Sequence, residues 1–76
     1  MKKLTKREAE VLDLLIKGKT NKEIASSLYI STHTVKAILE KLYEKLNIHN
    51  RVQLAVYYLK VLNSGSEDSL FSVRSN

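Results

Sequence analysis

Apolar residues along this chain recur at the spacing of a helix, not at the alternating spacing of a strand. In the stretch 31–47, STHTVKAILEKLYEKLN, the apolar positions follow an i, i+3, i+4, i+7, i+11 pattern: Val35, Ile38, Leu39, Leu42 and Leu46. Such a pattern places one buried stripe along a single helix. The chain has no proline and only two glycines, so the turn dipeptides of β-hairpins are missing. The sequence therefore predicts an all-α domain of four helices.

Helix end signals place the first three helices. Each is predicted to begin at a hydroxyl residue that can cap the free amides of its first turn: Thr5, Thr20 and Ser31. In the first two, a glutamate three residues later, Glu8 or Glu23, completes the spacing of a capping box. Gly18 and Asn47 suit the left-handed conformation that ends the first and third helices, because glycine has no Cβ and asparagine is the next-best residue there.

The fourth helix is predicted to begin after Asn50, with Gln53 three residues later, and to end near Leu62. Its sequence, VQLAVYYLKVL, is apolar on almost every side. One face carries Val52, Ala55, Val56 and Leu59, and the other carries Leu54, Tyr57, Tyr58, Val61 and Leu62. A helix on the outside of a small domain cannot bury both faces internally, so we expect the second set to form a homodimer interface. The alternative is a helix held centrally in the core of one chain.

A change of composition divides the chain into a domain, residues 1–62, and a polar, serine-rich tail, residues 63–76, which is predicted to be mobile. Residues 1–62 hold twelve Lys and Arg against six Asp and Glu, a net charge of +6, whereas the tail holds one Arg against two acids, a net charge of −1. A small basic domain suggests a polyanionic partner, most often nucleic acid and sometimes an anionic membrane. Charge alone is a weak signal for either.

The second and third predicted helices are joined by a very short turn, which is typical of a helix-turn-helix. Ala25 is small where the two helices must cross, and Ile30 and Val35 can close the small core between them. In such a unit the second helix enters the major groove of DNA with its N-terminal residues toward the bases. Lys36 and Ala37 lie near that end, where a lysine can donate to guanine and a short side chain allows close approach.

The residues that carry these features also resemble a known family. The segments LTKREAEVLDLLIKGKTNKEIASSLYIS at 4–31, TVK at 34–36 and KLNIHNR at 45–51 are similar to the LuxR-type, or GerE-type, DNA-binding domain of bacterial transcription regulators. The resemblance covers residues 4 to 62. It implies a compact four-helix domain that dimerises through its fourth helix and binds two half-sites of double-stranded DNA, with a recognition helix at about 32–46. It suggests either a stand-alone short regulator or a domain of a larger one.

The resemblance also implies which side chains meet DNA. The residues expected to face base edges are Lys36, Ala37 and Glu40. The residues expected to lie near phosphates are Asn21, Lys22, Thr32, His33, Thr34 and Lys41. The start of the second helix is a reasonable place for such a contact, because the free amides of a helix N-terminus can bind a phosphate.

Three positions depart from the family pattern. Ile38 stands where relatives often have histidine, and its place in the apolar stripe predicts a core residue. Asn47 replaces the usual glycine and can form the same cap. Glu40 stands where many relatives have a basic or small residue. It either accepts from cytosine N4 or faces solvent and pairs with a neighbour such as Lys36 at i,i+4 spacing.

Other polar residues are expected to have structural roles. Arg51 is expected to form an ion pair with Glu8 or Glu10 in preference to contacting DNA. His33 and His49 stand 16 residues apart in a chain without cysteine, so we expect no metal site and no cofactor. No nucleophile–base arrangement or pair of carboxylates is suggested, and a domain of this size has no room for a sizeable pocket, so we expect no enzyme.

Three functions remain in competition. The leading one is a sequence-specific transcription regulator that binds duplex DNA as a dimer in the bacterial cytoplasm, with RNA polymerase as a further candidate partner. No apolar run reaches the ~20 residues that span a bilayer, so we expect no membrane contact. The second is a module like region 4 of bacterial sigma factors, against which the KLNIHNR segment and the apolar fourth helix argue. The third is a protein-interaction module without DNA binding, which Glu40 on the reading face favours.

Overall fold

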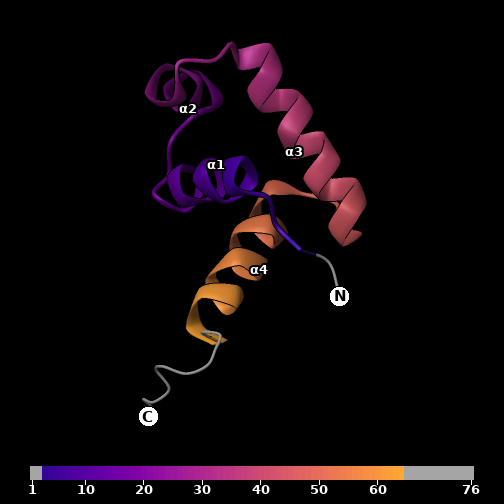
Figure 1. Ribbon diagram of the computed structural model, residues 1–76. Coiled ribbons are helices and arrows are strands. Elements are labelled where there is room, and N and C mark those ends of the chain that lie inside the picture. Colours follow the sequence, from indigo (N-terminus) through magenta and orange to yellow (C-terminus); the bar gives the residue numbers. More distant parts are fainter. Residues whose placement is uncertain (1–2, 65–76) are drawn as a thin grey trace.

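The computed structural model describes residues 3–64, which form four helices joined by short turns (Figure 1). The helices are α1, Lys6–Ile16; α2, Asn21–Leu28; α3, Thr32–Leu46; and α4, Arg51–Ser64. These residues contain no strand, so the predicted all-α fold of four helices is confirmed. α4 continues to Ser64, two residues into the segment that was predicted to be a tail. The rest of that segment, 65–76, lies outside the described residues.

The helix starts follow the local sequence as predicted. Thr5 Oγ1 accepts from the Glu8 amide at 3.1 Å, and Glu8 Oε1 accepts from the Thr5 amide at 2.9 Å. Thr20 and Glu23 make the same two hydrogen bonds at 3.2 Å and 2.8 Å. Each capping box satisfies two amides that helix geometry leaves without a partner. Residues three apart therefore determine where α1 and α2 begin.

The first three helices end in the same backbone conformation. A left-handed residue ends each of the first three helices: Gly18 (φ +83°), Tyr29 (φ +59°) and Asn47 (φ +55°). The amide of the next residue then reaches back to the last turn, as the Ile30 amide does to the Ala25 carbonyl oxygen at 3.0 Å. A left-handed tyrosine costs about 1–2 kcal/mol, and the packing of Ile30 against the core offsets this cost. The glycine and asparagine ends were predicted, whereas the conformation of Tyr29 was not.

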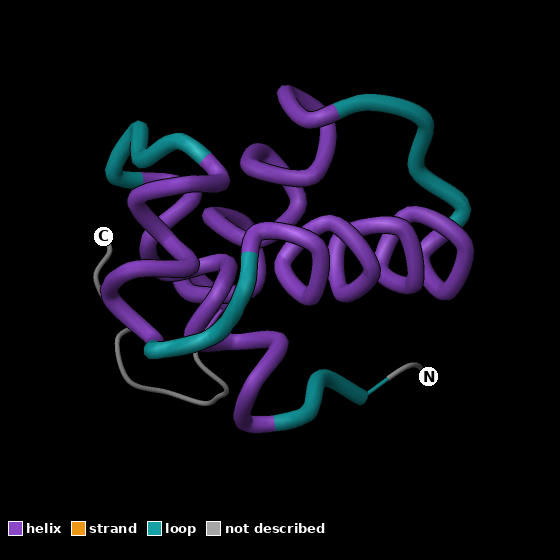
Figure 2. Tube along the Cα trace, turned by 90° about the horizontal axis from the view of Figure 1, so that it is seen from above, coloured by secondary structure: helices purple, strands orange, loops and turns teal. Residues whose placement is uncertain are grey.

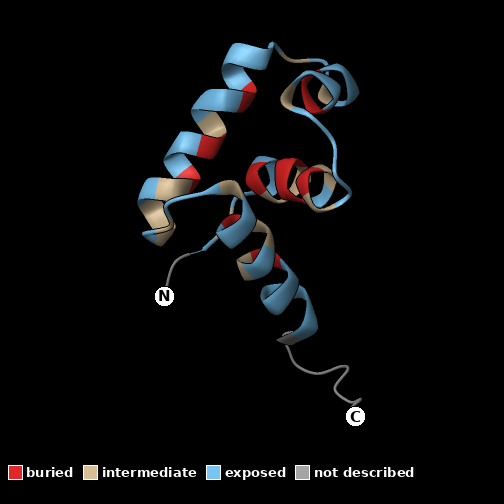
Figure 3. Cartoon of the chain, turned by 180° about the vertical axis from the view of Figure 1, so that it is seen from behind, coloured by how far each residue is buried: buried red, intermediate tan, exposed pale blue. Residues whose placement is uncertain are grey.

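α1 contacts each of the other three helices and lies between the α2–α3 pair and α4 (Figure 1). The view from above in Figure 2 shows that only short turns separate the helices. Ten buried side chains form the core: Val11, Leu12, Leu15, Ile24, Ala25, Val35, Leu39, Leu42, Leu54 and Tyr58. On α3 these buried positions run along one side, while the other side is exposed (Figure 3). Ile38 packs against the core as a partly buried residue, as predicted.

The orientation of α4 differs from the prediction. Leu54 and Tyr58 were expected at a dimer interface, but their side chains are 0% and 5% exposed in the core of a single chain. That expectation is wrong for these two residues. The reason is the packing of α4 on α1, where the Tyr58 hydroxyl donates to Asp13 Oδ1 at 2.6 Å. Of the other residues expected at the interface, Tyr57 is half-buried, and Val61 and Leu62 are exposed.

Candidate nucleic-acid interface

α2 and α3 form a tightly packed pair with a short turn between them. Ile24, Ala25 and Val35 are all buried between the helices, with Ala25 only 4% exposed. Ile30 in the turn packs against the same core. A small residue at the crossing lets the two helix backbones approach each other closely, which is the packing of a helix-turn-helix. The unit holds α3 with its apolar stripe inward and its polar face toward solvent.

The first turns of α2 and α3 present free backbone amides. In the part of the chain that the structure describes, these amides have no protein acceptor: Asn21, Lys22, Thr32 and His33. The Thr34 amide is already satisfied by Ser31 Oγ at 3.0 Å. Unsatisfied amides at a helix N-terminus, together with the helix dipole, favour an anion there. Both helices thus offer a place for a phosphate group.

The three residues predicted to read bases lie together on the exposed face of α3. Lys36, Ala37 and Glu40 line one open hollow with His33, and all four are exposed. They share one face because Glu40 lies one turn after both Ala37 and Lys36, at i+3 and i+4 spacing. A lysine, a short side chain and a carboxylate in one hollow provide a donor, an opening for close approach, and an acceptor.

Glu40 is a solvent-facing carboxylate without an ion-pair partner among residues 3–64. The ion pairs in this range join Arg7 to Glu10 and Lys45 to Glu8. The pairing of Glu40 with Lys36 that the i,i+4 spacing suggested is therefore not formed. The carboxylate oxygens of Glu40 remain available to accept hydrogen bonds.

The residues predicted to lie near phosphates differ in their exposure and in their hydrogen bonds, and one of them, His33, lines the hollow. Lys22, Thr32 and Lys41 are exposed. The hydroxyl of Thr34, also exposed, lies 3.0 Å from Ser31 Oγ and belongs to the cap of α3. Asn21 is half-buried, and its Oδ1 already accepts a hydrogen bond from Arg51 at 2.9 Å.

Arg51 does not form the ion pair that was expected. Its Nη1 donates to Asn21 Oδ1 at 2.9 Å and its Nη2 donates to the Lys19 carbonyl oxygen at 2.8 Å. The expected partners are engaged elsewhere, Glu8 with Lys45 and Glu10 with Arg7. Both acceptors of Arg51 lie at the start of α2.

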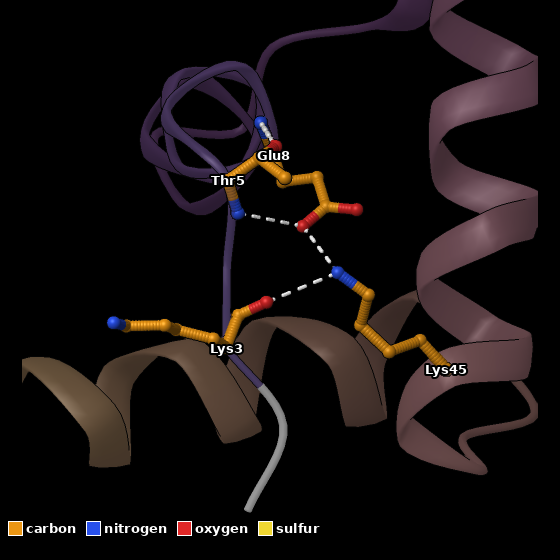
Figure 4. A network of polar contacts seen from close by, with 4 residues as sticks. All are labelled: Lys3, Thr5, Glu8 and Lys45. Carbon is orange, nitrogen blue, oxygen red and sulfur yellow. Dashed lines mark hydrogen bonds and ion pairs between the residues drawn. The ribbon is translucent and has the colours of Figure 1, made fainter.

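Glu8 anchors a small polar network between α1 and the end of α3 (Figure 4). Its Oε1 accepts from Lys45 Nζ at 2.7 Å, and the same Nζ donates to the Lys3 carbonyl oxygen at 3.1 Å. Burial acts to raise the pKa of Glu8, but hydrogen bonds and charge from Lys45 and hydrogen bonds from Thr5 outweigh it and hold this pKa below its ordinary value. Lys45 is therefore a structural lysine, unlike its exposed neighbours on α3.

α4 carries a second surface, which faces away from the core. Val52, Val56 and Leu59, which we call the α4 apolar face, are 72%, 45% and 47% exposed. They follow i, i+4, i+7 spacing along one side of the helix. A groove beside them is lined by Ile48, Val52, Gln53, Val56, Tyr57 and Lys60. The sequence showed this spacing but not which side of α4 meets α1.

Residues 3–64 contain neither a candidate metal site nor a candidate membrane-spanning helix. No group of three or more His, Cys, Asp and Glu side chains is placed to hold a metal ion. None of the helices in this range combines the length and the apolar character that a membrane crossing requires.

Comparison with known proteins identifies the family. The family model of bacterial regulatory proteins of the luxR family matches residues 2–58. The chain belongs to the LuxR family. This family consists of DNA-binding transcription regulators and not of enzymes.

Individual relatives of the LuxR family agree with this assignment. The chain is 50% identical over 54 residues to the transcriptional regulatory protein LiaR of Bacillus subtilis, covering 71% of this chain and 26% of LiaR. It is 46% identical over 57 residues to the nitrate/nitrite response regulator protein NarP of Escherichia coli, covering 75% of this chain and 26% of NarP. It is 47% identical over 58 residues to the spore germination protein GerE of Bacillus subtilis, covering 76% of this chain and 78% of GerE. The chain thus spans about a quarter of LiaR and NarP but most of GerE.

Proposed function

We propose that this LuxR-family chain binds duplex DNA in a sequence-specific manner as a homodimer. In this proposal α3 lies in the major groove, and Lys36, Ala37 and Glu40 face base edges. The starts of α2 and α3 meet the phosphate backbone on either side of the groove. The proposal concerns a transcription regulator in the bacterial cytoplasm, for which RNA polymerase is a further candidate partner.

One observation carries the proposal: the hollow on α3 reaches the first turn of that helix at His33, and the first turns of both α2 and α3 carry amides without a protein acceptor among residues 3–64. Lys36, Ala37 and Glu40 share that hollow, and the free amides belong to the first turns of α2 and α3. Base edges need side-chain donors and acceptors, while phosphates need amides or cations. The major groove, about 12 Å wide, admits one α-helix. The presence of both kinds of group on the α2–α3 unit supports binding to a duplex.

The α4 apolar face supports the homodimer. Val52, Val56 and Leu59 remain largely exposed in the single chain, and a contiguous apolar surface on a small domain favours association with another molecule. Val61 and Leu62 at the end of the helix are also exposed and can extend the contact. An interface formed by these few side chains buries less surface than a stable dimer usually does, so we expect a weak dimer in solution. Binding to two half-sites strengthens it, because each DNA-bound copy raises the effective concentration of the other.

The experiment that tests the proposal is selection from random duplex DNA by the purified chain, followed by sequencing. The variant Lys36→Ala is selected in parallel, and Lys17→Ala serves as a control in which an exposed lysine outside the proposed interface is removed. We expect the parent and Lys17→Ala to enrich an inverted repeat that Lys36→Ala loses. The spacing of the repeat would also give the distance between half-sites.

Two outcomes would contradict the proposal. If Lys36→Ala enriches the same sequences as the parent, α3 does not read bases through this face. If the parent enriches no sequence and binds no duplex at low salt, the proposal fails, and the protein-interaction module becomes the leading candidate.

A further inference from the structure

Arg51, the first residue of α4, donates hydrogen bonds from its guanidinium group to two neutral acceptors. Its Nη1 donates to Asn21 Oδ1 at 2.9 Å, and its Nη2 donates to the Lys19 carbonyl oxygen at 2.8 Å. No acidic side chain within residues 3–64 forms an ion pair with it. A planar guanidinium can donate two hydrogen bonds in fixed directions, which an ammonium group cannot. The arrangement therefore depends on the shape of arginine and not only on its charge.

These two bonds fasten α4 to the start of α2. Both side-chain hydrogen bonds that cross from α4 to this segment, in the described range, come from Arg51. The segment is also held from its other side, because the Lys19 amide donates to the Leu14 carbonyl oxygen of α1 at 3.2 Å. Lys19 is thus fixed through its amide by α1 and through its carbonyl by α4. The start of α2 has a defined position relative to both helices.

The position of this segment matters for a DNA contact. The amides of Asn21 and Lys22 have no protein acceptor in the described range, and the Lys22 side chain is exposed. Hydrogen bonds to a phosphate weaken steeply when the donor moves or tilts. Arg51 also begins the helix that carries the α4 apolar face. Its bonds therefore link the proposed phosphate-binding start of α2 to the helix that carries the proposed dimer interface.

We propose that Arg51 is a positioning residue for DNA binding, which holds the start of α2 against the phosphate backbone from its place on α4. The inference rests on the proposed function and adds a residue that does not itself touch DNA. It also explains why α4 is linked to the start of α2 by side-chain hydrogen bonds as well as through the common core.

The test measures affinity for a duplex recovered by the selection experiment, over a series of salt concentrations, for Arg51→Lys and Arg51→Gln. Lys22→Gln is the matched comparison, because it removes a cation from the same region that is proposed to contact phosphate directly. The urea unfolding midpoint of each variant is measured in parallel. Asn21→Ala, which removes one acceptor of Arg51 without changing α4, is included in case changes at Arg51 prevent folding.

If Arg51 acts by positioning, Arg51→Lys and Arg51→Gln both weaken binding, roughly three- to tenfold, although lysine keeps the charge. The slope of log affinity against log salt stays at the parent value for both, whereas Lys22→Gln lowers it by about one contact. Asn21→Ala also weakens binding. In the Asn21→Ala background, Arg51→Lys reduces affinity by a smaller factor than it does in the parent, because one acceptor of Arg51 is already missing. The unfolding midpoints of the single variants remain close to that of the parent.

Other outcomes would overturn the inference in distinguishable ways. If Arg51→Lys binds like the parent while Arg51→Gln weakens binding and lowers the salt slope, Arg51 contacts phosphate directly. If affinity falls only in proportion to the fraction of unfolded protein, the role of Arg51 is purely structural. If every variant, including Asn21→Ala, binds like the parent, the start of α2 needs no such support. If the parent itself binds no duplex, the proposed function fails, and the inference fails with it.

Discussion

Tyr58 and Asp13 join α4 to α1 through a hydrogen bond of 2.6 Å between the phenol hydroxyl and Oδ1. Tyr58 is 5% exposed, whereas Asp13 is at the surface. The ring therefore belongs to the core, while its hydroxyl reaches the edge of the domain. Together with the packing of α4 on α1, this bond holds α4 in one rotation about its own axis. That rotation determines which apolar side chains of α4 remain exposed to solvent.

The Tyr58–Asp13 bond predicts a pH-dependent stability. Burial and the hydrogen bond and charge of Asp13 raise the pKa of Tyr58 from 10.0 to about 12. Because the unfolded chain loses this proton at lower pH than the folded chain, the contribution of Tyr58 is fully present below pH 10 and is lost as pH rises toward 12. Tyr58→Phe should therefore be about 1 kcal/mol less stable at neutral pH, and its stability should fall less steeply above pH 10.

Urea unfolding of parent and Tyr58→Phe at a series of pH values checks this prediction. Lysine titration affects both proteins alike, so the difference between them isolates Tyr58. Equal slopes above pH 10 would mean that the phenol has the same pKa in the folded and unfolded states.

Two lysines on α3 should separate stability from DNA binding. Lys45 pairs with Glu8, whose side chain is 9% exposed, whereas Lys41 is exposed. Lys45→Ala leaves a buried charge without its partner and should cost about 1–3 kcal/mol of unfolding free energy. Lys41→Ala should change stability by less than about 0.5 kcal/mol and lower the salt slope of DNA binding by about one. Urea unfolding and salt-dependent binding of both variants provide the measurement.

The Glu8–Lys45 pair also predicts that the stability of the fold decreases at acidic pH. The pKa of Glu8 lies below its ordinary value of 4.5. The stability that this group contributes is therefore present above pH 4.5 and is lost as pH falls through the lower, folded-state pKa. In Lys45→Ala, burial of Glu8 is no longer opposed by a cation, so this loss should begin at higher pH. Superimposable acid-unfolding curves for parent and variant would contradict the assigned role of Lys45.

Local signals in the sequence predicted the helix ends because a cap depends on residues three or four apart. The Thr5–Glu8 box needs no information from other helices. The grouping of Lys36, Ala37 and Glu40 on one exposed face was predictable for the same reason, since they share one helix, whereas the hollow that they line is a finding of the structure. These features follow from helical geometry once the helix itself is identified.

Features that depend on contacts between helices were not predictable in the same way. Both sides of α4 are apolar, so the sequence does not indicate that Leu54 is buried in the core and that Val56 is exposed. The partners of Arg51 were missed because they are a backbone carbonyl and a neutral amide, which carry no charge signal. An exposed left-handed Tyr29 is equally unexpected, because glycine or asparagine fits that conformation better.

The two sides of α4 should respond differently to substitution. Val56→Asp places a charge on the α4 apolar face, where the parent side chain is 45% exposed. We expect a folded monomer that binds an inverted repeat more weakly, because the second copy no longer adds its contacts. Leu54→Ala instead removes a fully buried side chain and should cost about 2–5 kcal/mol of stability.

Sedimentation and urea unfolding distinguish these effects on α4. Val56→Asp should sediment as a monomer at concentrations where the parent associates, with an unfolding midpoint near that of the parent. A variant that still sediments as the parent dimer would exclude the α4 apolar face as the interface.

The carboxylate of Glu40 should affect specificity and overall affinity in opposite directions. It is exposed, has no ion-pair partner in the described range, and shares its hollow with Lys36. A carboxylate accepts from cytosine N4 in the major groove but repels the phosphates on both sides. Glu40→Ala removes both the charge and the acceptor, and should therefore lose roughly 1–3 kcal/mol of discrimination for cytosine at one position of each half-site, while its affinity for unrelated duplexes increases. Selection from random DNA, with binding to a non-specific duplex measured beside it, tests both effects. If the variant prefers the same sequence and binds all duplexes more tightly, Glu40 only repels phosphates and does not read a base.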